Sequence, residues 1–237
     1  MKTETTKNVS IKDKTLIAGV VSLALVFVVV LGAAMLELGP PAVDLRGPVA
    51  AHLADSGVSH PVTAVLLNYR GYDTLLEIAV LLLALLAILA VVGDSNVSSA
   101  PPSSPAPAAH PVLQTLARLA VPLMIVVAVY LLWAGAFRPG GAFQAGAVLA
   151  AAAVLLHLVG LLPSWNTPRL ALRIGLVGGF VLFLAVAAAL LWQGALLQYP
   201  PDLAGGLILL IESGLTISLA LILAGLYLFL SRAAADS

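Results

Sequence analysis

Two carboxyl side chains stand inside apolar runs of this sequence and are its first candidates for chemistry. Glu77 lies near the start of Leu75–Val92, where it is the only ionisable residue, and Glu212 lies deeper in the apolar segment that begins at Leu203. A carboxyl group in a hydrocarbon layer is costly, and such groups usually face a partner or a hydrated path. We therefore treat both as candidate ion-path residues. Two other interpretations stay open. Glu77 is about 3 Å past the helix start, within reach of headgroup water, and a neutral Glu212 would join two helices by a hydrogen bond.

Polar groups elsewhere in the apolar runs extend this candidate site. Ser213 and Thr216 follow Glu212 closely enough to hydrogen-bond its carboxyl or to line a hydrated pocket. His157, near the end of another run, carries an imidazole that titrates near neutral pH and could relay protons. The alternative for His157 is a packed or interfacial side chain.

A glycine-rich turn with the sequence RPGGAFQAG separates two of the apolar runs. Its residues of interest are Pro139, Gly140, Gly141, Phe143, Gln144 and Gly146. Proline followed by glycines predicts a tight reversal, and the helix that starts after it offers free backbone N–H groups at its N-terminus. The simpler interpretation is a short hairpin between two membrane spans. Gly146 on one run, with Gly175 and Gly179 on the next, belongs to small-residue patterns that favour close helix packing.

Other kinds of site are not supported by the sequence. There is no cysteine and no HExxH pair of histidines, which argues against thiolate and zincin-type metal sites. The net charge is zero, so a nucleic-acid partner is not indicated. No nucleophile motif or cofactor motif is visible. We therefore expect a protein that is not an enzyme and that holds no metal and no cofactor.

The composition limits the kind of scaffold that positions these residues. Hydrophobic residues make up 61% of the 237-residue chain and charged residues 9%, whereas soluble domains carry about 25% charged residues. We therefore expect an all-α integral membrane protein. Six runs are long enough to cross a bilayer, approximately Leu16–Leu36, Thr74–Val92, Leu119–Ala136, Ala142–Leu162, Ala171–Trp192 and Leu203–Leu230. Most Lys and Arg residues then fall on the side of the N-terminal tail, so the positive-inside rule places both termini in the cytoplasm. The membrane that we expect is the plasma membrane.

The loop between the first two runs, Glu37–Asp73, contains a segment with helical spacing of apolar residues. The apolar residues of this segment, His60–Arg70, are Val62, Val65, Leu66 and Tyr69. This pattern predicts a short helix that lies on the membrane surface or on a neighbouring protein of a complex. An ordinary loop is the alternative.

A second segment divides the chain into parts. Gly93–His110 is rich in Ser, Ala and Pro and has one charged residue, which is typical of a linker. We therefore expect a two-span module over residues 1–92, a linker over 93–112 and a four-span module over 113–237. This organisation suggests two proteins fused into one chain.

Two stretches of the chain resemble known families. Pro139–Leu149 (PGGAFQAGAVL) resembles the PGGGFQGG turn of the MnhB family, which are membrane subunits of Mrp-type multisubunit sodium/proton antiporters. Pro61–Ile78 (PVTAVLLNYRGYDTLLEI) is similar to the C-terminal end of the large subunit of these antiporters and to the corresponding subunit of membrane-bound hydrogenases, where the pattern is DFRGxDTLGE. Asp73 and Glu77 of that pattern are kept. The loss of the first acid at Asn68 puts any ion-binding role of that position in doubt.

The resemblance implies an accessory membrane subunit of a multisubunit cation/proton antiporter. It implies that Glu77 lies in an ion path for Na⁺ or H⁺, and that Arg70 and Asp73 organise the approach to it. The expected partners are the other membrane subunits of such a complex. Two alternatives remain: the chain belongs to the membrane arm of a redox-driven pump such as a membrane-bound hydrogenase, or it is a structural scaffold without an ion path.

Overall fold

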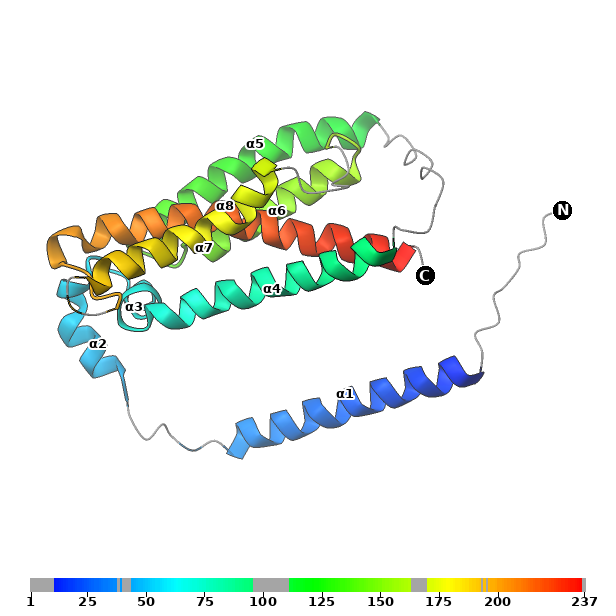
Figure 1. Cartoon of the computed structure of the whole chain (residues 1–237), viewed down its shortest axis with the longest axis horizontal. Helices are drawn as coiled ribbons and strands as arrows, with labels where there is room; N and C mark the ends of the chain where they lie inside the picture. Colours follow the sequence, from blue (N-terminus) through cyan, green and yellow to red (C-terminus); the bar gives the residue numbers. More distant parts are fainter. Residues whose placement is uncertain are drawn as a thin grey trace. The chain divides into compact units, whose positions relative to one another are not determined.

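The computed structural model describes residues 11–37, 39, 44–95, 111–162, 170–192, 194 and 196–235, and every regular element in these ranges is helical (Figure 1). In chain order the elements are α1 (Ile11–Glu37), α2 (Arg46–His52), η1 (Leu53–Ser56), α3 (Pro61–Ala64), η2 (Val65–Tyr69), α4 (Gly71–Ser95), α5 (Pro111–Ala134), α6 (Ala142–Leu158), α7 (Leu170–Leu191) and α8 (Pro201–Ala235). The predicted all-α class is confirmed.

All six predicted apolar runs coincide with helices of the structure. Four helices of the described chain are long and apolar enough to cross a membrane: Gly71–Ala90, Pro111–Ala134, Leu170–Leu191 and Pro201–Leu230. The apolar stretches Val21–Glu37 and Ala142–Leu158 are shorter. Several boundaries differ from the prediction by four residues or more, because α1 begins at Ile11, α5 begins at Pro111, α6 ends at Leu158 and α8 ends at Ala235. A membrane-spanning helix satisfies its own backbone groups, so an apolar run of this length has one stable local structure.

The chain divides into two compact units, Met1–Leu45 and Arg46–Ser237. The first unit contains α1, whose described side chains are almost all exposed and mostly hydrophobic. A helix that is apolar on every side is suited to lipid or to other membrane helices. The predicted linker lies largely outside the described residues, and the division into modules at residues 92 and 113 stays a prediction.

Helix α8 is the centre of the second unit and packs against α4, α6 and α7. In Figure 1, α4 to α8 run side by side along roughly one direction. The large apolar side chains of α8 that are fully buried recur every three or four positions, which is the spacing of one helix face: Ile208, Ile211, Leu215, Leu219 and Ile222. The first four form a core with Phe183 of α7 and Ile78 of α4, whereas Ile222 packs in a second cluster with Leu85 of α4 and Leu176 of α7.

Small residues bring the helices into close contact, as predicted from their spacing. A Cβ atom added at Gly179 of α7 would lie 2.6 Å from the carbonyl oxygen of Gly214 on α8. One added at Gly146 of α6 would lie 2.9 Å from the Cβ of Leu219, and one at Gly175 would lie 2.5 Å from the Cδ1 of Leu221. Gly146 and Gly179 therefore set the distances of α6 and α7 from α8, whereas the Leu221 side chain beside Gly175 can rotate away.

The short helix predicted within the loop Glu37–Asp73 is present as α3 and the π-helical turn η2. The face that it buries contains Thr63, Ala64 and Leu67, whereas Val62 and Leu66 stay 55% and 45% exposed. The predicted apolar stripe thus faces away from the core, as expected for a helix whose apolar side meets lipid or a partner protein. Helices α2 and η1 in the same loop were not predicted.

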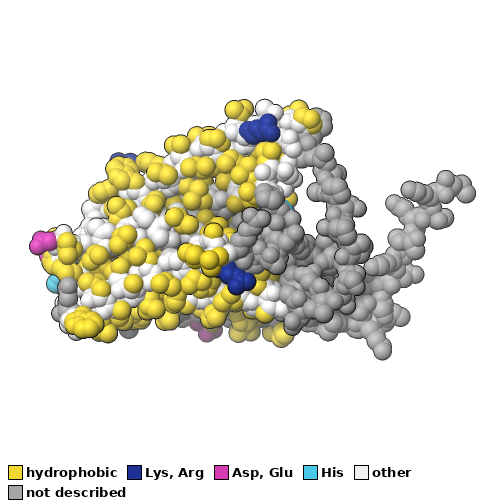
Figure 2. Space-filling view, turned by 45° about the horizontal axis from the view of Figure 1, so that its top comes forward, with side chains coloured by type: hydrophobic (Ala, Val, Ile, Leu, Met, Phe, Trp, Pro, Cys, Tyr) yellow, Lys and Arg dark blue, Asp and Glu magenta, His cyan; other side chains and the backbone are white. Residues whose placement is uncertain are grey.

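The surface of the second unit is unusually apolar. Figure 2 shows one face on which hydrophobic side chains predominate and charged side chains are isolated. Large side chains such as Leu119 and Leu170 are 72% and 74% exposed. Such a surface is suited to contact with lipid and with other membrane proteins.

Candidate functional site

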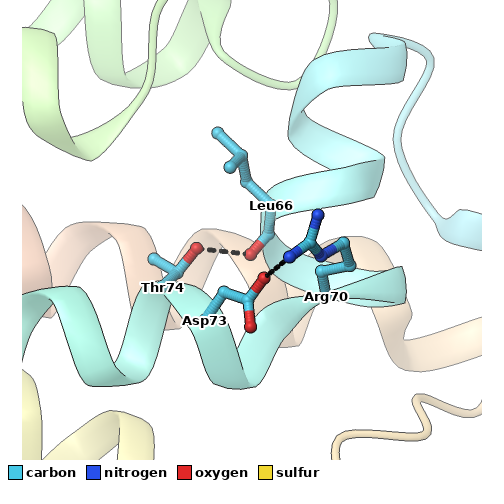
Figure 3. A network of polar contacts seen from close by, with 4 residues as sticks. All are labelled: Leu66, Arg70, Asp73 and Thr74. Atoms are coloured by element: carbon cyan, nitrogen blue, oxygen red, sulfur yellow. Dashed lines mark hydrogen bonds and ion pairs between the residues drawn. The ribbon is translucent and has the colours of Figure 1, made fainter. Parts of the chain in front are cut away.

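The helix that carries Glu77 begins at a helix break after η2, where the chain is continuous but its helical geometry is interrupted (Figure 3). Arg70, with φ −129° and ψ 34°, ends the π-helical turn, and α4 starts at the next residue. The Thr74 hydroxyl donates a hydrogen bond of 2.6 Å to the carbonyl of Leu66 and so satisfies one backbone group at the break. Arg70 forms an ion pair with Asp73 across the same break.

The Arg70–Asp73 ion pair lies at the surface of this break. The two side chains are 58% and 36% exposed, and a pair so exposed contributes little to stability. Asp73 also stands in the first turn of α4, where the helix dipole stabilises a negative charge. The prediction that these residues organise the approach to Glu77 is not tested by this geometry.

A cavity of about 440 Å³ opens beside the break. Its walls come from α3, η2, the start of α4, the α5–α6 turn and α8. The lining residues are His60, Val62, Thr63, Leu66, Leu67, Thr74, Glu77, Pro139, Gly140, Gly141, Ala142, Phe143, Gln144, Glu212 and Leu215. Elements that are far apart in the sequence therefore build one partly polar pocket.

The two acids selected from the sequence both line this pocket. Glu77 is exposed, whereas Glu212 is buried, with a relative accessibility of 4%. One carboxyl group is thus fixed in the inner wall, and the other stands where the pocket meets the surface. Gln144, also in the wall, adds an amide that both donates and accepts hydrogen bonds.

The glycine-rich turn places the start of α6 against Glu212. Gly141 has a φ of +106°, a backbone conformation that favours glycine, and it is the N-cap of α6 without any capping side chain. Its N–H donates to the carbonyl of Leu131, at 2.9 Å. The next N–H, that of Ala142, donates to Oε1 of Glu212 at 3.3 Å. The carboxyl on α8 therefore replaces the missing cap of α6.

The hydroxyl groups beside Glu212 do not serve its carboxyl, contrary to the prediction. Ser213 donates to the carbonyl of Leu209, and Thr216 donates to the backbone carbonyl of Glu212, each one turn back along α8. Hydroxyl side chains within helices commonly form this bond with the preceding turn. The polar surroundings of the carboxyl come instead from the α5–α6 turn.

The segment before α3 is hydrogen-bonded to the end of α5. The backbone N–H groups of Ser59 and His60 both donate to the carbonyl of Ala136, at 2.9 and 3.1 Å. The Thr63 hydroxyl donates to the carbonyl of Gly135 at 2.6 Å. The carbonyls at a helix C-terminus lack intrahelical partners, so this segment supplies the donors that α5 needs.

The remaining predicted residues are separated from the pocket. His157 lies near the opposite end of α6, and its buried Nδ1 has no hydrogen-bond partner among the described residues. Gly146 packs on α8, as described above. No cluster of potential metal ligands occurs in the described part of the chain.

Sequence reasoning missed His60, Thr63 and Thr74, which line the pocket. The available signals were weak. His60 directly precedes the proline at which α3 begins, and each threonine is a polar residue in a mostly apolar segment. Their roles become visible only in the hydrogen bonds of Thr63 to the carbonyl of Gly135 and of Thr74 to the carbonyl of Leu66.

Residues 112–231 match a family model described as a domain related to the MnhB subunit of Na⁺/H⁺ antiporter. This range includes the glycine-rich turn and Glu212. No curated protein matches the chain.

Two solved structures share the fold. The chain is 23% identical to a chain of the membrane-bound sulfane sulfur reductase, an archaeal respiratory membrane complex, with a TM-score of 0.66 over 92% of this chain and 97% of that one. It is 22% identical to a chain of the Mrp complex from Dietzia sp. DQ12-45-1b, with a TM-score of 0.67 over 94% of this chain and 26% of that one. This chain thus spans about a quarter of the Mrp chain that it matches.

Proposed function

The chain belongs to the MnhB family, and from this premise we propose that it is an accessory membrane subunit of a multisubunit Na⁺/H⁺ antiporter in which Glu77 and Glu212 contribute to the ion path. The observation that carries the proposal is the shared pocket. Two acids from different membrane-spanning helices line one cavity, together with Gln144 and two threonine hydroxyls. Carboxylate, amide and hydroxyl oxygens are the ligands that hard cations prefer, and a carboxylate also binds protons.

The placement of Glu77 supports obligatory partners. It is exposed within a helix long enough to cross a membrane, and an ionisable group facing lipid is costly. A partner protein that covers this side would remove the carboxyl from lipid and extend the polar path. The exposed apolar residues Val62 and Leu66 border the same pocket. This chain therefore supplies only one part of the proposed ion path, and partner proteins supply the rest.

The proposal also includes the fusion of two modules into one chain and the orientation of this chain in the membrane. The family model covers residues 112–231, whereas the structural likeness extends over more than nine-tenths of the chain. This supports an upstream module comparable to the C-terminal end of the large antiporter subunit or to its counterpart in membrane-bound hydrogenases. Both termini lie in the cytoplasm and the membrane is the plasma membrane.

The test is transport by the complex purified with its native partners and reconstituted into vesicles. Glu77→Gln removes the charge and keeps the size, and we expect it to lower Na⁺/H⁺ antiport at least about tenfold. Asp202→Asn is the control, because Asp202 is an acid in the first turn of α8 and does not line the pocket. If Glu77→Gln and the control variant show the same antiport activity, Glu77 is not in the ion path and the chain acts as a structural scaffold. In that case substitutions at Gly146 or Gly175, which disturb the packing of α6 or α7 on α8, would weaken assembly with partner proteins, while Glu77→Gln stays active.

A second candidate function is a place in a redox-driven pump. It is favoured by the likeness to the sulfane sulfur reductase chain, which is matched over 97% of its length. The proteins that co-purify with the chain distinguish the two functions, since a redox-driven complex contains an electron-transfer module. Ion movement that depends on an electron donor would support this alternative, and movement driven by a Na⁺ or proton gradient alone would support the antiporter.

A further inference from the structure

Glu212 and the glycine-rich turn are about 70 residues apart in the sequence, but in this fold they are in direct contact. A Cβ atom placed on Gly141 would lie 2.6 Å from Oε1 of Glu212 and 3.8 Å from its Cδ. The carboxyl therefore occupies the space that any other side chain at position 141 would need. The φ of +106° at this glycine points the missing side chain toward α8 rather than toward solvent.

The turn is fixed on its other side by α5. A Cβ added at Gly140 would lie 2.5 Å from the carbonyl oxygen of Leu131, and one at Gly135 would lie 2.7 Å from the Cα of Gly141. The N–H of Gly141 is itself bonded to Leu131. The turn cannot move away from Glu212 without losing these backbone contacts. Its position relative to the carboxyl is thus determined by α5.

The start of α6 is an electrostatic partner for the acid. The N-terminus of a helix carries a partial positive charge, and its free N–H groups stabilise an anionic oxygen. Among the described residues, the hydrogen bond to the carboxyl uses Oε1 alone. Oε2 then remains for whatever enters the pocket. A charged lysine or arginine in this role would neutralise the acid fully, whereas a helix terminus orients it and leaves it able to bind a cation.

We propose that Gly141 and the N-terminus of α6 are positioning elements that hold the Glu212 carboxyl in the wall of the pocket, where it receives a small monovalent cation or a proton. The proposal rests on the proposed function for its transport consequence. The contact between turn and carboxyl stands independently of that function. His60 and Glu77 are the other titratable groups that line this pocket.

The first experiment compares two glycines that both have a positive φ, +106° at Gly141 and +71° at Gly160. Gly141→Ala introduces a Cβ against Glu212, whereas Gly160→Ala is the control, because Gly160 has a φ of +71° with open space around its missing side chain. In the reconstituted complex we expect Gly141→Ala to lower Na⁺-dependent antiport at least about tenfold more than Gly160→Ala. Equal losses in the two variants would overturn the proposal.

The second experiment tests whether the loss acts through the carboxyl. Glu212→Asp shortens the side chain by one methylene and makes room for a Cβ at position 141. We expect the double variant Gly141→Ala/Glu212→Asp to be at least about threefold more active than the product of the two single effects, since residues in contact are non-additive. The apparent KM for Na⁺ should recover together with the rate. Strictly multiplicative effects would show that the two residues act separately.

A third measurement remains informative if Gly141→Ala fails to assemble. Amide hydrogen exchange of the peptide that contains Ala142 is compared in the wild-type complex, Glu212→Gln and Glu212→Leu. Gln keeps a side-chain oxygen acceptor and should preserve slow exchange, whereas Leu should accelerate it at least about threefold. Unchanged exchange in Glu212→Leu would refute the contact. Normal antiport in Glu212→Gln with preserved slow exchange would refute the ion-path role of Glu212 and overturn the proposal that the turn holds this carboxyl for a cation.

Discussion

The crossing of α7 and α8 provides a quantitative test of the packing, because two neighbouring glycines of α7 differ completely in their surroundings. A Cβ added at Gly179 would lie 2.6 Å from the carbonyl oxygen of Gly214 and 2.7 Å from the Cβ of Ser218. A Cβ added at Gly178 would have nothing within 4 Å. The two Gly→Ala variants make the same chemical change on the same helix, so their difference isolates the interhelical contact.

The expected magnitude follows from these distances. Non-bonded carbon atoms are optimal at about 3.5–4.0 Å, so the added methyl group at Gly179 is about 1 Å too close to α8. Two of the three clashing atoms, the carbonyl oxygen and carbonyl carbon of Gly214, belong to the backbone, which cannot rotate away as a flexible side chain can. Overpacking of this kind costs about 1–3 kcal/mol. At Gly178 the same change should be neutral or stabilise the helix by up to about 1 kcal/mol.

The assay is unfolding of the purified complex in bicelles titrated with SDS, followed by far-UV circular dichroism. Gly179→Ala should unfold at a lower SDS fraction than the wild type, and Gly178→Ala should unfold at the same fraction or a higher one. If the two variants unfold together, or if Gly179→Ala is the more stable of the pair, the close crossing at Gly179 and Gly214 is not what holds α7 against α8.

Three further predictions use the same unfolding assay. Thr63→Val removes the hydroxyl that donates to the carbonyl of Gly135 and should lower the free energy of unfolding by about 1–3 kcal/mol. Thr63→Ser keeps the hydroxyl and should lower it clearly less. Equal losses in the two variants would mean that the hydrogen bond is unimportant. Asn68→Asp replaces the amide that donates to the carbonyl of Ser56 by an acceptor. An ionised carboxylate would face the carbonyl oxygen of Ser56, which raises the pKa of the new acid in the folded state. The loss of stability should therefore be larger at pH 8 than at pH 4. A loss that does not depend on pH would contradict the hydrogen bond. Burial raises the pKa of Tyr199, whose hydroxyl has no partner among the described residues. The folded protein therefore loses stability as the pH rises above the unfolded-state pKa of this phenol, about 10. Tyr199→Phe should remove this alkaline loss at no cost near neutral pH. An alkaline profile unchanged in Tyr199→Phe would assign the loss to another group.

The helices could be predicted from the sequence because their cause is local. Apolar runs in a bilayer have no external partners for backbone N–H and C=O groups, so each run becomes a helix regardless of its neighbours. The bounds of α4 and α7 follow the runs closely. The ends of α5 and α6 were less predictable, because Pro111 and the residues after Leu158 depend on capping and loop contacts.

The hydrogen bonds of the candidate site could not be predicted with the same success. Ser213 and Thr216 are the closest hydroxyls to Glu212 in sequence, but their rotamers direct them back along α8. Thr63 and Thr74 are inconspicuous in sequence and line the pocket nevertheless. Sequence distance along a helix predicts which residues share a face. It does not predict which face another helix covers.

The sequence by itself determined which residues are anomalous: two acids in apolar runs and a turn with successive glycines, each recognisable because hydrocarbon and backbone sterics penalise them locally. Only the tertiary structure decided that Glu77 and Glu212 line one pocket and that Glu212 caps the helix after Gly141. The physical reason is that helix formation depends on neighbours in the chain. The meeting of two side chains from distant helices depends on how closely glycines such as Gly146 and Gly179 let those helices approach.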